Sequence, residues 1–323
     1  MSTILEVQDL KKYFRVGGKG QLHAVDGVSF QIEKGQTLGV VGESGCGKST
    51  LGRTILHLIE PTSGKIIFDG RDISDPDRQT MTYLRENMQI IFQDPFSSLN
   101  PRMSVSETIM EPMVIKGGMS KADMLNKTVK LIDTVGLAQR FTNSYPHELD
   151  GGRRQRIGIA RALALDPKFI VCDEPVSALD VSIQAQILNL LLDLQEERQL
   201  SYIFITHDLS VVKYISNNIL VMYLGQMVEL APSDELFANP THPYTEALLS
   251  AIPVADIHAP RQRVKMEGEL NSPIDPKPGC RFMSRCPYAT ARCAEPQIFR
   301  DISPNHQVTC WMRQEEAAKR QSV

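Results

Sequence analysis

The sequence predicts an α/β fold with a mixed sheet and a helical subdomain, followed by a small cysteine-rich C-terminal domain. Short apolar segments typical of buried strands alternate with stretches of helical periodicity, and residues 104–165 are mostly helical in pattern. After about residue 255 proline becomes frequent and the periodicity fades. We therefore expect one domain over 1–255, with its helical subdomain at about 94–165, and a second over 256–323.

Composition excludes several classes of protein. The chain has 323 residues, of which 42% are hydrophobic and 23% charged, as in ordinary globular proteins. Its 35 basic and 38 acidic residues give a net charge of −3, so we expect no nucleic-acid partner. No apolar run approaches the roughly 18 residues that span a bilayer, and the N-terminus lacks the pattern of a secretory signal. We expect a cytoplasmic protein that reaches a membrane only by docking.

Three apolar segments predict the strands of the core. TLGVVG (37–42) is expected to be a buried strand, with a helix over 47–58 after it. FIVCDE (169–174) and SYIFITH (201–207) flank an amphipathic helix over 182–197. A strand, a helix and a second strand in this order imply that the two strands are parallel.

The segment after the first strand, GESGCGKS (42–49), matches the phosphate-binding pattern G-x-x-x-x-G-K-[ST]. Main-chain N–H groups of such a loop surround phosphate oxygens, and the following helix N-terminus adds positive potential. Lys48 is expected to reach the β- and γ-phosphates, and Ser49 to ligate Mg²⁺. This predicts a P-loop NTPase core. The expected ATP-binding residues of the loop are Gly42, Glu43, Ser44, Gly45, Cys46, Gly47, Lys48, Ser49 and Thr50.

Two carboxylates end the FIVCDE strand. Asp173 is expected near the coordination sphere of Mg²⁺. Glu174 follows it and is expected to polarise the attacking water. Together with the P-loop, they predict nucleotide hydrolysis.

Further motifs indicate the kind of NTPase. LDGGR (149–153) precedes the two carboxylates and SALD (177–180) follows them. Gln93 ends a further predicted strand, MQIIFQ (88–93), and His207 ends SYIFITH. This set, in this order, resembles the ATPase subunits of ABC transporters over roughly residues 4–255. The resemblance implies a head-to-tail dimer, in which each ATP lies between one chain's P-loop and the other chain's signature.

The same resemblance implies roles for single residues. Gln93 would be the Q-loop glutamine near Mg²⁺ or water, and His207 the switch histidine at the γ-phosphate. Tyr13 would be the aromatic residue that stacks on adenine. The signature facing the partner's nucleotide would be Asp150, Gly151, Gly152 and Arg153. The D-loop would be Ser177, Ala178, Leu179 and Asp180.

The C-terminal sequence narrows the resemblance. HPYTEALLSAIP (242–253) and the cysteine-bearing tail are similar to those of bacterial oligopeptide and dipeptide importer ATPases. That implies short peptides as cargo, two transmembrane permease subunits, a peptide-binding protein and peripheral attachment to the cytoplasmic face of the inner membrane. Importers of nickel, opines or glutathione share this tail. A non-transport ABC ATPase, and an iron–sulfur redox sensor that binds ATP, compete with this interpretation.

Four of the six cysteines fall within residues 280–310, spaced C-x5-C-x6-C-x16-C. Cytoplasmic proteins rarely use disulfides, so the cluster suggests metal binding by Cys280, Cys286, Cys293 and Cys310. Zinc sites usually contain one tighter pair, so the wide gaps favour a [4Fe–4S] cluster. Zinc binding stays open, and so does a tail without metal whose thiols are reduced or paired. His306 is expected at the surface.

The signature departs from the LSGGQ pattern of the family, because Asp150 stands where serine is usual. An ionised carboxylate can only accept hydrogen bonds. At about 4 Å from a phosphate charge and an effective dielectric near 20, it would oppose binding by about 4 kcal/mol. We therefore expect a heterodimer with a second, different ABC ATPase subunit and two unequal sites. A tolerated substitution, in which the Gly151 and Gly152 N–H groups suffice, is the competing interpretation.

Overall fold

The computed structural model describes residues 2–18, 20–252, 266, 268 and 272–321, and these form two units. The helical unit contains residues 33–36 and 75–205, and the P-loop unit contains residues 3–32, 37–74 and 206–321. The domain boundary expected at residues 255 and 256 lies outside the described residues.

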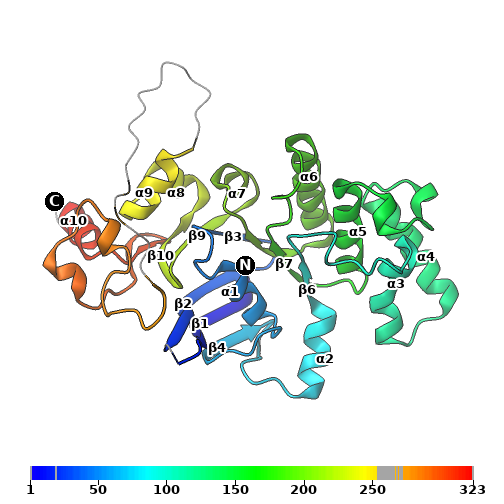
Figure 1. Cartoon of the computed structure of the whole chain (residues 1–323), viewed down its shortest axis with the longest axis horizontal. Coiled ribbons are helices and arrows are strands. Elements are labelled where there is room, and N and C mark those ends of the chain that lie inside the picture. Colours follow the sequence, from blue (N-terminus) through cyan, green and yellow to red (C-terminus); the bar gives the residue numbers. More distant parts are fainter. Residues whose placement is uncertain (1, 19, 253–265, 267, 269–271, 322–323) are drawn as a thin grey trace. The chain divides into compact units, whose positions relative to one another are not determined.

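The helical unit is built on three parallel strands, β6, β7 and β8, in which β7 pairs with both neighbours. Their bounds are Met88–Ile91, Phe169–Asp173 and Ser201–Ile205. Figure 1 labels β6 and β7. Every residue of β7 and β8 is buried, which explains why both sequences are almost entirely apolar. Helix α6 (Val181–Arg198) connects them. The predicted parallel strand–helix–strand arrangement is confirmed.

Three further helices of this unit confirm the helical pattern of residues 104–165, and one more precedes them. They are α2 (Arg78–Asn87), α3 (Val105–Lys116), α4 (Lys121–Thr134) and α5 (Gly151–Leu163), with short 3₁₀ turns at Gln139–Phe141 and Pro146–Glu148. Helix α3 packs against both α4 and α5. Its start is defined by a capping box, in which Ser104 and Glu107 each bond the other's main-chain N–H.

The P-loop unit contains the predicted strand at residues 37–42 as β3 (Thr37–Val41), which is buried throughout. Helix α1 (Lys48–Ile55) follows the loop and is shorter than predicted. Strand β9 (Asn218–Tyr223) pairs in parallel with β3, and β10 (Gln226–Pro232) pairs antiparallel with β9. Helix α7 (Leu209–Ile215) precedes β9.

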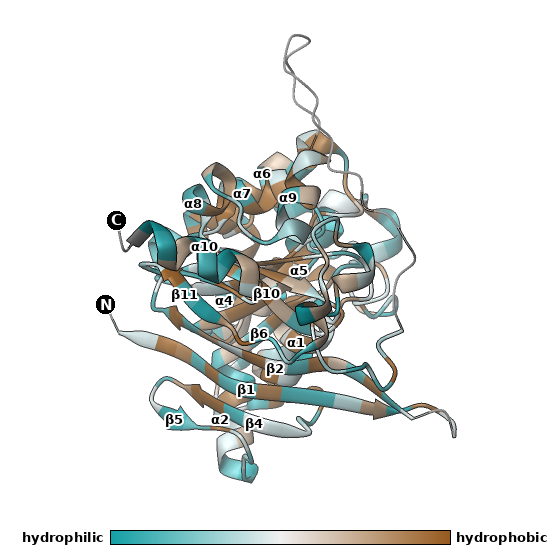
Figure 2. Cartoon of the chain, turned by 90° about the vertical axis from the view of Figure 1, so that its left-hand side faces the viewer, coloured by the Kyte–Doolittle hydropathy of each residue, from teal (hydrophilic) through white to brown (hydrophobic). Residues whose placement is uncertain are grey.

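A second, antiparallel sheet of the P-loop unit was not predicted. Its order is β2-β1-β4-β5, with bounds Gln21–Glu33, Thr3–Arg15, Ser63–Phe68 and Arg71–Asp72. Hydrophobic and hydrophilic residues follow one another along β1 without a regular period (Figure 2). A register shift between Gln8 and Lys11 interrupts the alternation expected of a strand with one buried face.

The C-terminal segment joins the core of the P-loop unit. Strand β12 pairs antiparallel with β10 and with β11, and Phe282 packs in one cluster with Val41 of β3 and Tyr244 of α9. The bounds are α8 Ser233–Ala238, α9 Pro243–Ser250, β11 Arg300–Ser303, β12 His306–Val308 and α10 Trp311–Gln321, with 3₁₀ turns at Met283–Arg285 and Ala291–Ala294. The expectation that His306 is a surface residue is wrong. Its side chain is 2% exposed and its Nε2 lies 2.7 Å from Oε1 of the fully buried Glu229.

Candidate functional site

The loop between β3 and α1 has the backbone shape that its glycines allow. Gly42 and Gly47 have φ values of 148° and 105°, a region that other residues rarely adopt. A Cβ atom at Gly42 would lie 2.2 Å from the Met222 carbonyl oxygen, and one at Gly47 would lie 2.0 Å from that of Ala24. Both positions therefore require glycine.

Lys48 is buried and folds back over the loop. Its Nζ donates to the carbonyl oxygens of Gly42, at 2.8 Å, and Glu43, at 3.0 Å. The ammonium group is thus held at the loop, where it can exchange these carbonyls for phosphate oxygens. Ser49 and Thr50 lie in the first turn of α1, and Ser44 and Gly45 form the exposed tip of the loop.

Cys46 contributes its main chain to the loop. Its side chain is 3% exposed, and burial raises the pKa of the thiol despite the neighbouring Lys48 ammonium. The Cys46 carbonyl accepts a bond of 2.8 Å from the Gly225 N–H, which fixes the peptide. This agrees with a role for the Cys46 backbone rather than its thiol.

Tyr13 is half-buried and belongs to an aromatic pair. Its ring stacks on that of His23, with centroids 3.9 Å apart and planes inclined by 19°. The Tyr13 hydroxyl donates to Asp26, and His23 Nδ1 lies 3.1 Å from the same carboxylate. Neither His23 nor Asp26 was predicted, because no sequence motif marks either residue.

His207 lies two residues beyond the end of β8, in the P-loop unit, and its side chain is exposed. The preceding Thr206 is anchored by a main-chain bond of 3.2 Å to the Val40 carbonyl of β3. The following Asp208 caps α7 by accepting from the N–H groups of Ser210 and Val211. His207 therefore stands on a short segment that is fixed on both sides.

The helical unit brings Gln93 and Glu174 together. Gln93 Nε2 donates to Glu174 Oε2 at 2.9 Å. Asp173 is the last residue of β7 and is 1% exposed, whereas Glu174 is half-buried just beyond it. The backbone φ of Glu174 is +49°, a strained value for a residue with a side chain, and its N–H donates to Ile205 at 3.0 Å. This positive φ turns the chain sharply directly after β7.

The predicted signature begins helix α5. Asp150 is the N-cap: its Oδ1 accepts from the Arg153 N–H at 2.8 Å, and its other oxygen pairs with the Arg153 guanidinium. The Asp150 carboxylate is therefore already engaged within its own chain. Burial of Gly152 against Ile183 leaves no room for a side chain, since a Cβ atom would lie 2.8 Å from Ile183 Cγ2.

The predicted D-loop lies beside the signature in the same unit. A Cβ atom at Gly151 would approach Leu179 Cδ2 to 3.2 Å. Ser177 Oγ donates to the Glu174 carbonyl at 3.1 Å. Ala178 is exposed, and Asp180 occupies the N-cap position of α6. The signature, the D-loop and the Gln93–Glu174 pair are thus all features of the helical unit, while the P-loop, Tyr13 and His207 belong to the P-loop unit.

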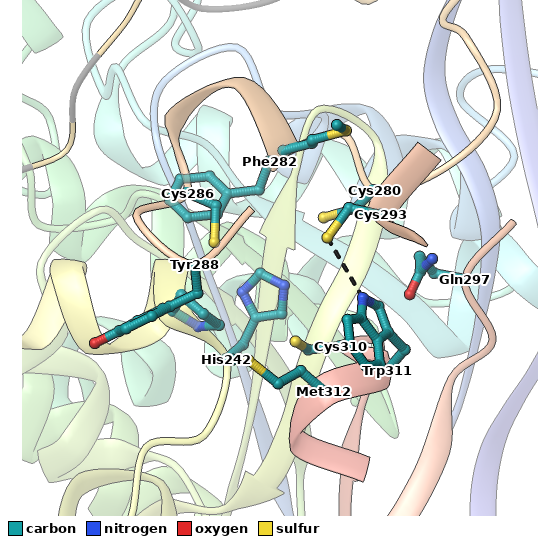
Figure 3. A pocket seen from close by; sticks show the side chains of 12 residues that line it. His242, Cys280, Phe282, Cys286, Tyr288, Cys293, Gln297, Cys310, Trp311 and Met312 are labelled. Carbon is teal, nitrogen blue, oxygen red and sulfur yellow. Dashed lines mark hydrogen bonds between the residues drawn. The ribbon is translucent and has the colours of Figure 1, made fainter. Parts of the chain in front are cut away.

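The four C-terminal cysteines line one small pocket together with His242 and Trp311 (Figure 3). Their sulfur atoms point into it from different segments, and the pocket has a volume of about 20 Å³. Trp311 Nε1 donates to Cys293 Sγ at 3.4 Å. The predicted convergence of Cys280, Cys286, Cys293 and Cys310 is therefore present.

A metal centre is not supported by this arrangement. Within the described part of the chain, no group of three or more His, Cys, Asp or Glu side chains is placed to hold a metal ion. Burial raises the pKa of Cys280 to about 12 and also raises the pKa values of Cys286 and Cys310. Burial alone would raise the pKa of Cys293 as well, but bonds from Thr290 and Trp311 lower it. The predicted [4Fe–4S] cluster therefore has its four sulfur donors at one pocket, but the described residues do not place them as a set of metal ligands.

Comparison with known proteins decides the family. A family model described as "ABC transporter" matches residues 25–177, and one described as "Oligopeptide/dipeptide transporter, C-terminal region" matches residues 228–293. The oligopeptide transport ATP-binding protein AppF of Bacillus subtilis (strain 168) is 51% identical over 319 residues, covering 95% of this chain and 97% of that protein. The chain belongs to the ABC transporter family.

Other relatives place this ABC ATPase with ATP-binding subunits. The dipeptide transport ATP-binding protein DppF of Haemophilus influenzae is 49% identical over 302 residues and 92% of each chain. Among solved structures, the ATP-binding cassette MJ0796, a dimer in a post-hydrolysis state with ADP and Pi, superposes with a TM-score of 0.65. It is 29% identical and covers 71% of this chain and 99% of its own.

No helix in the described part of this ABC ATPase is long and apolar enough to cross a membrane.

Proposed function

We propose that this chain is the ATP-binding subunit of an importer of short peptides and couples ATP hydrolysis to their transport through membrane subunits. One observation carries the proposal: about half of the residues of this chain are identical to those of proteins named for oligopeptide and dipeptide transport, over nearly the full length of both. The C-terminal region match extends this support beyond the ATPase motifs. Di- and oligopeptides are the proposed cargo.

The proposed mechanism assigns a task to each motif. The P-loop N–H groups and Lys48 bind the phosphates, and Tyr13 stacks on adenine. Ser49, Gln93 and Asp173 would hold Mg²⁺, which neutralises charge on the phosphates when it is bound.

Glu174, oriented by its 2.9 Å bond from Gln93, accepts the proton of the attacking water. The water oxygen forms a bond to the γ-phosphorus while the bond between the γ-phosphorus and the β–γ bridging oxygen breaks, and ADP is the leaving group. His207 contacts the γ-phosphate and reports its loss.

The ATPase part of the proposal is tested by two substitutions in the purified chain. Lys48→Ala should abolish ATP binding, because it removes the cation at the phosphates, while Lys213→Ala on α7 should not. ATP binding that survived in Lys48→Ala would contradict the assignment of the P-loop.

The cargo is tested separately, with the assembled transporter in vesicles. Peptide added with its binding protein should stimulate ATP hydrolysis, and the peptide should accumulate inside the vesicles. Stimulation by nickel or glutathione alone would contradict peptide import.

We also propose that each ATP is completed by a second, different ABC ATPase subunit. The support is Asp150, whose carboxylate would face a phosphate in a homodimer. Its bond to Arg153 reduces that repulsion but leaves a donor missing. In the heterodimer, a serine-containing signature of the partner would complete the active site over this chain's P-loop, and Asp150 would face the partner's P-loop and leave that site slow or silent. Glu174→Gln here should therefore abolish nearly all ATPase activity, whereas the equivalent change in the partner should be milder. Equal losses would favour Asp150 as a tolerated substitution.

The proposed assembly contains two transmembrane permease subunits and a peptide-binding protein that delivers substrate. The chain would then be peripheral, on the cytoplasmic face of the inner membrane. It has no proposed nucleic-acid partner, in keeping with its net charge of −3.

We further propose that residues 256–323 form a C-terminal region whose four cysteines hold a [4Fe–4S] cluster after local rearrangement. The donor set supports this, since four thiols face one pocket. Anaerobically purified protein should contain about four iron atoms per chain and absorb broadly near about 400 nm. Colourless protein with stoichiometric zinc, or with no metal, would contradict the cluster. Cys286→Ser should remove the iron while leaving ATP binding measurable.

A further inference from the structure

Glu43 of the P-loop is held by an arginine from the C-terminal segment. Arg285 Nη1 lies 2.8 Å from Glu43 Oε2, and its Nη2 lies 3.1 Å from Oε1. Two parallel bonds of this kind fix both the distance and the orientation of a carboxylate. The side chains are 11% and 25% exposed, so solvent screens the pair weakly. The pair joins residues 242 positions apart in the sequence.

The main chain of Glu43 is fixed by the same region. Its N–H donates to the hydroxyl of Tyr244 at 2.8 Å, and Tyr244 is completely buried in α9. Its carbonyl accepts from Lys48 at 3.0 Å. When Lys48 turns to a phosphate, that last bond is lost. Glu43 then keeps the bonds from Arg285 and Tyr244 and a bond of 3.3 Å from the Cys46 N–H to its carbonyl, and only the first two come from outside the loop.

A second arginine of this segment holds the aromatic pair. The Arg281 guanidinium donates to the carboxylate of Asp26 and to the Leu224 carbonyl, and its side chain is 6% exposed. Asp26 in turn accepts from the hydroxyl of Tyr13 and contacts His23. Arg281 thus fixes the group that orients Tyr13.

We infer that Arg285 and Arg281 are positioning residues for ATP, supplied by the C-terminal segment. Arg285 holds the P-loop in its phosphate-binding shape through Glu43. Arg281 holds Tyr13 at the adenine through Asp26. The inference rests on the proposed ATP-binding function. Groups that are already oriented bind without an ordering cost, so loss of either arginine should weaken nucleotide binding.

The two arginines act on different parts of the nucleotide, which provides the test. Affinities of the full chain are measured by displacement of a fluorescent ATP analogue with MgADP and with inorganic pyrophosphate. Arg285→Met should lower the affinities for MgADP and for pyrophosphate by about tenfold each, because the P-loop binds the phosphates of both ligands. Arg281→Met should lower the affinity for MgADP by a similar factor and leave the affinity for pyrophosphate unchanged. Arg292→Met is the matched control, since Arg292 pairs with Glu315 at the surface of the same segment.

A double-mutant cycle then tests the path through Glu43. Glu43→Gln should weaken binding as Arg285→Met does, and the double variant should be no weaker than the worse single variant. Single effects that multiply in the double variant would overturn the inference, as would wild-type affinity in Arg285→Met or equal loss of both ligands in Arg281→Met. If Arg285→Met does not fold, Glu43→Gln decides alone. Failure of the wild-type chain to bind nucleotide, or Lys48-independent binding, would instead contradict the proposed function.

Discussion

Glu174 combines three features that suit a general base. It directly follows a buried parallel strand, its backbone φ of +49° turns the chain sharply there, and Gln93 orients its carboxylate. Strained backbone of this kind persists where the surrounding fold holds it in place, as the Ile205 carbonyl does here. The geometry gives the carboxylate one defined orientation at the end of β7.

The first prediction concerns this carboxylate. Glu174→Gln should bind ATP with unchanged affinity but lower the hydrolysis rate by about 100-fold or more, because the amide cannot accept the water proton. Phosphate release from the assembled complex measures the rate. Glu196→Gln, on the exposed face of α6, is the control. A rate close to that of the wild type would contradict the role of Glu174.

The second prediction concerns Asp150. Asp150→Ser should leave stability nearly unchanged, because serine is also a good N-cap for α5, whereas Asp150→Ala should lose about 1 kcal/mol. In the assembled complex, Asp150→Ser should increase ATPase activity, since it replaces a repelling carboxylate with a donor. Urea unfolding and phosphate release measure the two effects. Lower activity in Asp150→Ser would show that the carboxylate has a positive role.

At the scale of the element, the C-terminal strands are joined to the core by a buried polar contact. Glu229 of β10 is completely buried and accepts from the N–H groups of Thr241 and His242, both at 2.9 Å. His306 of β12 is the third hydrogen-bond partner of the Glu229 carboxylate, with its Nε2 at 2.7 Å from Oε1. A buried carboxylate that loses a partner is costly, so this contact should matter for the pairing of β12 with β10.

The third prediction follows from that contact. His306→Ala should lower the free energy of unfolding by about 3 kcal/mol, because Glu229 would lose a buried partner. The neighbouring Gln307→Ala, which removes an exposed bond to Asp301, should cost less than about 0.5 kcal/mol. Denaturant titrations compare the two variants. Equal costs would mean that the buried pair adds nothing.

The buried strands β3, β7 and β8 could be predicted from the sequence, but the buried strand β9 and the antiparallel sheet were not predicted. β7 and β8 are apolar except for one terminal residue each, because every residue in them is buried. β1 mixes exposed and buried residues around a register shift, which hides its period. The P-loop and both carboxylates were predicted because local motifs mark them. Glu229–His306 and Glu43–Arg285 join residues 77 and 242 positions apart, and such pairings leave no local signal.

For the whole molecule, the proposed shared sites make activity depend on assembly. The fourth prediction is that the isolated chain hydrolyses ATP very slowly, and that the rate per chain rises with concentration as subunits associate. Addition of the second ATPase subunit should raise it further. The measurement is phosphate release over a dilution series, with Glu174→Gln as the background. Full activity per chain at high dilution would contradict sites shared between subunits.

If this ABC ATPase serves a membrane importer, it should be recovered together with the membrane subunits of that importer. The most direct test is purification of the tagged chain from detergent-solubilised membranes of its own cell, with identification of what accompanies it. We expect two proteins with several membrane-spanning segments and a second ABC ATPase, in equal amounts, and ATPase activity that Glu174→Gln abolishes. Recovery of the chain without membrane proteins, or together with ribosomes or DNA, would contradict the claim.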